Sequence, residues 1–118
     1  MITAVDLIAL AAPDFGGTCT RSPETSAILD LPVKLVDGRI IPYQLLLKQE
    51  GDRVTAQEET PQHLPPFCPE RHINPDGTFC LYFTGATRLN VIDEESARAW
   101  LETVYRYLKL QERARVQR

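Results

Sequence analysis

The chain has 118 residues, 43% of them hydrophobic and 25% charged, which is the composition of a single globular domain over residues 1–118. Its formal net charge of -3 argues against a nucleic-acid surface, because such a surface is normally basic. No apolar run approaches the ~20 residues that cross a bilayer, and three cysteines without a basic leader predict a cytoplasmic protein with reduced thiols and no membrane contact.

The first predicted element is a short helix over residues 3–12. Thr3 can cap it, and Asp6 places a negative charge near the positive end of the helix dipole. Pro13 should end the helix, since proline disfavours a helical conformation in the residue before it. A helix this short is marginal alone and must pack on the rest of the protein. Residues 14–24, which contain Gly-Gly, Pro and Ser, predict a loop.

Two alternating segments then predict a β-hairpin. Apolar residues fall on one face of each: Leu29, Leu31, Val33 and Leu35 in the first, and Ile41, Tyr43, Leu45 and Leu47 in the second. A two-residue turn that starts at Asp37 would place Lys34 opposite Ile41 and mix polar with apolar residues on each face. A three-residue loop over residues 37–39 pairs Leu35 with Ile41 instead. We predict this register because it keeps the apolar faces together.

A turn at residues 50–52 leads to a weaker third strand over residues 53–59, which completes an antiparallel meander with one apolar face. The prolines that follow forbid regular structure and predict a stiff crossing: Pro61, Pro65, Pro66 and Pro69. The clearest helix spans residues 93–115, with Asp93 as its cap. Its apolar stripe should cover the sheet, and consists of Ala97, Trp100, Leu101, Val104, Tyr107 and Leu108.

Residues 67–81, which begin with Phe-Cys-Pro, concentrate the reactive side chains of the chain: two of three cysteines and one of two histidines. Gly77 opens a short run, Gly-Thr-Phe-Cys-Leu, that delivers the Cys80 thiol just after a turn. His72 and Asn74 lie upstream, and both side chains can donate hydrogen bonds to a nearby negative charge. We predict Cys80 as a nucleophile. A buried structural thiol is the alternative for Cys80, and Cys68 is the competing nucleophile, although Phe and Pro flank it.

A meander, a proline-rich crossing, a His…Asn…Gly-x-x-Cys-Leu segment and a covering helix together resemble the ubiquitin-conjugating enzyme (UBC) fold. Those enzymes carry a His-Pro-Asn tripeptide, a glycine turn and a catalytic cysteine followed by leucine. Here His72-Ile73-Asn74 replaces the tripeptide and lies two residues closer to the cysteine. The likeness covers about residues 27–108 and is sharpest to compact bacterial relatives from ubiquitin-like modification systems. It implies an α+β, UBC-like fold with the active-site cysteine in the proline-rich crossing.

The resemblance implies an enzyme that accepts a ubiquitin-like protein from an activating enzyme as a thioester on Cys80, without a cofactor, and transfers it to an amine of a target protein. Cysteine suits this task because its thiolate is a good nucleophile and its thioester stays transferable. A donor to the tetrahedral oxyanion is worth ~2.7–4 kcal/mol. Matching the tripeptides gives that role to Asn74, and matching glycine and cysteine without a gap gives it to His72. Asp76 and Asp93 are the positional candidates for accepting a proton.

Two other hypotheses concern the same residues. Cys68, His72 and Cys80, with Cys19 or His63 as fourth ligand, could form a tetrahedral zinc site. Their spacing lacks the paired C-x2-C pattern that makes a zinc prediction strong. The other alternative is an inactive UBC-like scaffold that only docks a partner, which the retained thiol and donors disfavour.

Overall fold

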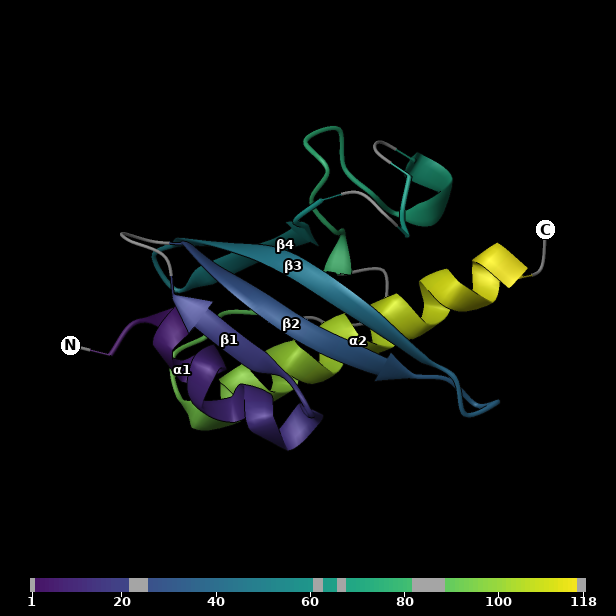
Figure 1. Cartoon of the computed structure of the whole chain (residues 1–118). Helices are drawn as coiled ribbons and strands as arrows, with labels where there is room; N and C mark the ends of the chain where they lie inside the picture. Colours follow the sequence, from purple (N-terminus) through teal and green to yellow (C-terminus); the bar gives the residue numbers. More distant parts are fainter. Residues whose placement is uncertain (1, 22–25, 61–62, 66–67, 82–88, 117–118) are drawn as a thin grey trace.

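The computed structural model describes residues 2–21, 26–60, 63–65, 68–81 and 89–116. The predicted positions Pro61, Pro66 and Phe67 lie outside the described residues. The protein is α+β, with a short N-terminal helix, a four-stranded antiparallel sheet and a long C-terminal helix (Figure 1). The predicted class and the order of the main elements are confirmed. None of the described helices combines the length and the apolar character needed to cross a membrane.

The sheet has its strands in the order β1-β2-β3-β4, all neighbours antiparallel. The strands are β1 (Thr18–Arg21), β2 (Ser26–Lys34), β3 (Ile40–Glu50) and β4 (Arg53–Glu58). β1 falls where a loop was predicted, and that prediction is wrong, since Cys19 pairs with Leu29 of β2. The threonines on both sides of Cys19 favour an extended chain, and the Gly-Gly pair before them ends the preceding turn. The short strand β1 is one edge of the sheet.

The β2–β3 hairpin corrects the predicted register by two residues. Val33, rather than Leu35, lies opposite Ile41. The loop is residues 36–38: the Leu35 N–H donates to the Arg39 carbonyl over 2.8 Å. Gly38 has φ 92, a left-handed conformation that favours glycine, and this requirement fixes the loop. A shift of two residues keeps every side chain on its face, so the apolar faces still coincide as predicted.

The N-terminal helix α1 (Ala4–Ala11) begins with the predicted cap. The Asp6 N–H donates to Thr3 Oγ1 over 3.3 Å, and the Thr3 N–H donates to Asp6 Oδ2 over 2.9 Å. The 3-10 turn η1 (Ala12–Phe15) follows directly and contains Pro13, so the α-helix ends where proline was expected to end it.

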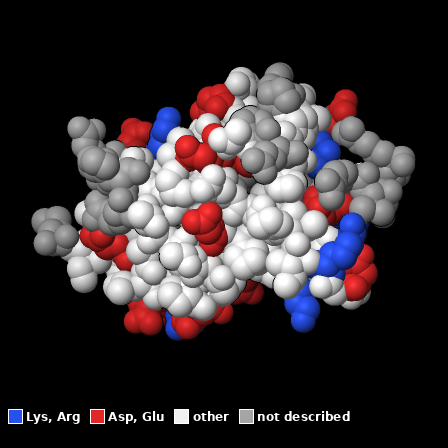
Figure 2. All heavy atoms as spheres, in the orientation of Figure 1, with Lys and Arg blue, Asp and Glu red and all other residues white. Residues whose placement is uncertain are grey.

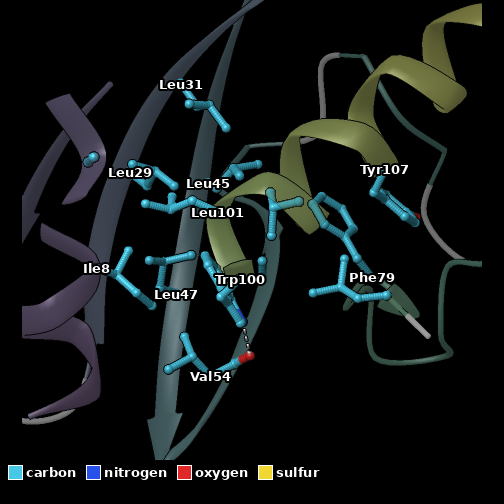
Figure 3. Close-up of a cluster of buried hydrophobic side chains, with 14 of the residues drawn as sticks. Ile8, Leu29, Leu31, Leu45, Leu47, Val54, Phe79, Trp100, Leu101 and Tyr107 are labelled. Carbon is cyan, nitrogen blue, oxygen red and sulfur yellow. Dashed lines mark hydrogen bonds between the residues drawn. The ribbon is translucent and has the colours of Figure 1, made fainter. Parts of the chain in front are cut away.

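The C-terminal helix α2 (Glu94–Val116) packs on the same face of the sheet as α1 and completes one hydrophobic core. Its predicted cap is confirmed: the Ser96 N–H donates to Asp93 Oδ1 over 2.8 Å. All six residues of the predicted stripe are buried. Figure 3 shows Trp100 between the sheet and the helix, with its indole N–H donating to the Val54 carbonyl over 3.1 Å. The helix is therefore held directly against β4.

Charged side chains are scattered over the face seen in Figure 2, which has the orientation of Figure 1. Asp and Glu atoms lie among uncharged atoms in the middle of this face and also at its margins, and the Lys and Arg atoms visible there lie toward the margins. Among the described residues this face carries no continuous basic patch, in keeping with the net charge of -3.

Candidate active site

The Cys80 segment, which we define as residues 68–81, lies beyond β4 and over the C-terminal half of α2 (Figure 1). It starts with a single 3-10 turn, η2 (Pro69–Arg71), and continues as a small hairpin. The Phe79 N–H donates to the Ala56 carbonyl of β4 over 2.8 Å, so the hairpin is attached to the edge of the sheet. The Cys80 segment is thus an ordered, hydrogen-bonded element next to the core.

The hairpin brings the three predicted site residues together. The Cys80 N–H donates to the His72 carbonyl over 2.9 Å, which places these residues opposite each other. The Asn74 N–H donates to the Thr78 carbonyl over 2.9 Å, two residues farther along. Ile73, between them, is buried and bridges to the opposite strand. Asn74 is therefore the diagonal neighbour of Cys80, a relation that corresponds to roughly 7–8 Å between backbones.

The predicted turn after Asn74 is present and is held by a short chain of hydrogen bonds. Thr78 donates to Asp76 Oδ1 through its hydroxyl over 2.6 Å and through its N–H over 3.0 Å. Asn74 Nδ2 donates to Thr78 Oγ1 over 3.1 Å. The hydrogen bonds from Thr78 hold the pKa of Asp76 below its usual value. Gly77, at φ 89, allows the reversal. This network fixes the orientation of the Asn74 amide.

His72 has φ 60 and ψ 41, and no other described non-glycine residue has a positive φ. A left-handed conformation at such a residue costs on the order of 1 kcal/mol, so the surroundings must hold it. The His72 N–H donates to the Pro69 carbonyl over 3.2 Å. The His72 carbonyl accepts the Cys80 N–H and also the Tyr107 hydroxyl over 3.1 Å. The strained residue thus connects the cysteine to α2.

Two residues of α2, Tyr107 and Gln111, form what we name the α2 clamp. The Tyr107 hydroxyl lies 3.3 Å from the Arg71 carbonyl, and Gln111 Nε2 donates to that carbonyl over 2.6 Å. Arg71 Nε donates to Gln111 Oε1 over 2.7 Å, and Nη2 donates to the Gln111 carbonyl over 3.0 Å. Arg71 is only 7% exposed. The Tyr107 ring stacks on Phe79 with centroids 4.5 Å apart. The clamp therefore holds the segment by both polar and apolar contacts.

Cys80 and Cys68 are both partly exposed residues, and both lie near the clamp. Burial raises the pKa of Tyr107, the Arg71 guanidinium opposes this shift, and the two neighbouring thiols add to it. At neutral pH Tyr107 is consequently a neutral phenol that donates its proton to backbone carbonyls. The site combines two thiols, one buried cation and a fixed amide.

Other residues predicted for this region lie elsewhere. Cys19 is on β1, at the opposite edge of the sheet from β4. His63 lies against β3, with Nε2 3.2 Å from the Pro42 carbonyl. Within the described part of the chain, no group of three or more His, Cys, Asp or Glu side chains could hold a metal ion, so the zinc hypothesis is unsupported. Asp93 caps α2 roughly four turns before Tyr107, too far to serve Cys80.

Sequence reasoning missed Arg71, Gln111 and the second role of Tyr107. Tyr107 was assigned to the apolar stripe, which is correct for its ring but does not predict a partner for its hydroxyl. Gln111 follows Tyr107 by four residues and lies on the same helix face, where a polar side chain is unusual. That signal was available, because a buried amide must find hydrogen-bond partners.

The family described as Prokaryotic E2 domain matches residues 15–118. The chain belongs to this family. Neither a search of curated proteins nor a search of solved structures found a match. Membership confirms the bacterial E2-like assignment and points to an E2-like conjugating function, with a ubiquitin-like protein and an activating enzyme as the implied partners. The residues described above are thus the candidate active site of a prokaryotic E2 domain.

Proposed function

We propose that this prokaryotic E2 domain carries a ubiquitin-like protein as a thioester on Cys80 and transfers it to an amine of a target protein. The main support is the pairing of a partly exposed Cys80 with His72, beside the fixed amide of Asn74, in a chain of this family. Cys68 is a weaker candidate, because its backbone pairs with Ile73 at the base of the hairpin and no predicted donor lies opposite it.

The reaction has two steps. In the first, the Cys80 thiolate attacks the thioester between the ubiquitin-like protein and the activating enzyme. A new carbon–sulfur bond forms, and the activating enzyme leaves as its own thiolate. In the second, a target lysine that has lost a proton to water attacks the acyl carbon. The carbon–nitrogen bond forms, the attacking nitrogen gives its second proton to water, the bond to Cys80 breaks, and the thiolate is regenerated.

Asn74 is our choice as the donor that stabilises the oxyanion of both steps. A useful donor must be oriented before the charge develops. The Asn74 amide meets this condition, since Thr78 holds it and Asp76 holds Thr78. Of the two N–H groups of that amide, the described contacts use one. His72, by contrast, has an exposed side chain on a left-handed residue.

The test is reconstitution with the activating enzyme and ubiquitin-like protein from the same organism, followed by gels with and without reductant. A reducible adduct should form with the wild type and with Cys68→Ser, and should be absent with Cys80→Ala. An adduct that survives Cys80→Ala excludes Cys80 as the carrier.

The donor is tested in the second step, by single-turnover transfer from the preformed thioester. Asn74→Ala should slow transfer by about 10²–10³-fold, and His72→Ala should slow it much less. The reverse order would give the donor role to His72. Binding of the partner proteins without any thiol-dependent adduct would make the domain a docking scaffold.

A further inference from the structure

A groove of about 990 Å³ lies between the C-terminal half of α2 and the β2–β3 loop, with η1 at one end. We name it the α2 groove. No described residue of the Cys80 segment lines it. In Figure 1 the C-terminal half of α2 runs between the Cys80 segment and the β2–β3 loop. The groove is therefore separate from the candidate active site.

The lining of the groove offers apolar surface. Phe15, Leu35, Tyr105 and Leu110 are all partly buried and line its walls. Val36, in the loop of the β2–β3 hairpin, is 96% exposed. Loop positions of this kind usually hold Gly, Asn, Asp or Ser, so a fully exposed valine has no local structural reason. Together these residues provide a place for a large apolar side chain of another molecule.

The rim of the groove is positively charged on the α2 side. Arg106, Lys109 and Arg113 are exposed, and none of them has an ion-pair partner among the described residues. One exposed carboxylate, Glu102, lies beside them. The whole lining carries four cations and four carboxylates, so the excess of cations is confined to the exposed side chains of α2.

The other carboxylates of the lining are already engaged. Asp37 pairs with Arg39 over 2.7 Å, and Asp14 pairs with Arg98. Glu112 is buried and accepts a hydrogen bond from Tyr43 over 3.3 Å. These contacts leave the three cations of α2 as the charges most available to a ligand.

We propose that the α2 groove docks an acidic segment of a partner protein that carries at least one large apolar side chain. The apolar side chain would pack between Val36 and Leu110, and the acidic residues would lie along Arg106, Lys109 and Arg113. The apolar walls favour such a polypeptide over a nucleic acid, which binds through phosphates. Because the groove is separate from Cys80, a docked partner would leave the thiol accessible. This proposal is independent of the thioester chemistry.

The test is selection of random twelve-residue peptides on the reduced wild-type protein, with counter-selection on a groove variant, Arg106→Glu plus Lys109→Glu. Selected peptides are then measured by fluorescence anisotropy and mapped by amide chemical shifts. We expect peptides rich in Asp and Glu around a large apolar residue. Their affinity should fall about tenfold or more in the groove variant and in Val36→Asp, but not in Arg53→Glu, which changes an exposed cation on β4. Circular dichroism of each variant confirms folding.

Several outcomes would overturn the proposal. The selected peptides could be neutral or basic, or their affinity could be unchanged in the folded groove variant. The amide chemical-shift changes could also fall on residues outside the groove. Tighter binding of oligothymidylate than of the acidic peptides would assign the cations to a nucleic acid. Shifts of groove residues that depend on protein concentration alone, with a dimer in light scattering, would assign the groove to a second copy. In all arms Cys80→Ala should bind as the wild type does.

Discussion

The clamp of α2 on the Cys80 segment makes Tyr107→Phe the most informative single substitution. It removes one hydroxyl and keeps the ring that stacks on Phe79 at 4.5 Å. The hydroxyl lies 3.1 Å from the His72 carbonyl and 3.3 Å from the Arg71 carbonyl. Both carbonyls retain another donor, Cys80 N–H and Gln111 Nε2 respectively, so neither is left unpaired. The free energy of unfolding should therefore fall only by the net value of a typical hydrogen bond, about 1 kcal/mol.

Amide hydrogen exchange at Cys80 measures this effect where it matters. Its N–H is bonded to the same His72 carbonyl, so a loss of about 1 kcal/mol should raise its exchange rate about fivefold. The midpoint of thermal unfolding should fall by about 4 °C. The matched control is Tyr105→Phe, which removes a phenolic hydroxyl that accepts from the Lys34 N–H, away from the thiol. Unchanged Cys80 exchange in Tyr107→Phe would refute the contribution of the Tyr107 hydroxyl to the clamp.

Three further predictions concern the turn and the buried cation. Gly77→Ala should lower the free energy of unfolding by roughly 1 kcal/mol, because Gly77 has φ 89, and Gly38→Ala should have a similar effect, because Gly38 has φ 92. Only Gly77→Ala should also slow transfer in the thioester assay. The pKa of Asp76 is lower in the folded protein than the value of 3.8 in the unfolded chain, so its carboxylate stabilises the fold at pH values above 3.8. This stabilisation is lost as the pH falls through the lower pKa of the folded state. In urea titrations from pH 6 to pH 2, wild type should lose more stability than Asp76→Asn, and equal losses would contradict the contact. Gln111→Leu should lower the free energy of unfolding by about 2 kcal/mol, because it removes the side-chain acceptor of Arg71 Nε while the main-chain carbonyl that accepts from Nη2 remains, and chemical denaturation would detect this loss.

The meander shows what hydrophobic alternation can and cannot determine. Alternation assigned the inward faces of β2 and β3 correctly, since side chains repeat with a period of two. The same period makes registers that differ by two residues equivalent, so it could not separate Val33 from Leu35 as the partner of Ile41. The left-handed requirement at Gly38 decided between them. β1 was missed because Thr-Cys-Thr is a short signal between two loop-like stretches.

The sequence predicted the residues of the candidate active site but not how their backbones pair. Composition identified Cys80, His72 and Asn74, and the Asn-Pro-Asp-Gly turn followed from its residues. The spacing did not require residues 72–74 to pair with residues 78–80. The same residues around an Asn-Pro-Asp-Gly turn are equally compatible with an open loop and with a hairpin. The left-handed conformation of His72 was also inaccessible, because it depends on tertiary contacts from Tyr107.

The Cys80 segment depends on contacts with the rest of the domain to keep its conformation. A two-stranded hairpin is marginally stable alone, and this one also contains a strained residue at its first pair. Its stability must come from outside, and the structure supplies two attachments: Phe79 on β4 and the clamp on α2. Both attachments act on backbone or buried atoms and leave the residues Cys80 and Asn74 partly exposed. Loosening α2 should therefore affect transfer even though no α2 side chain is proposed to touch the acyl group.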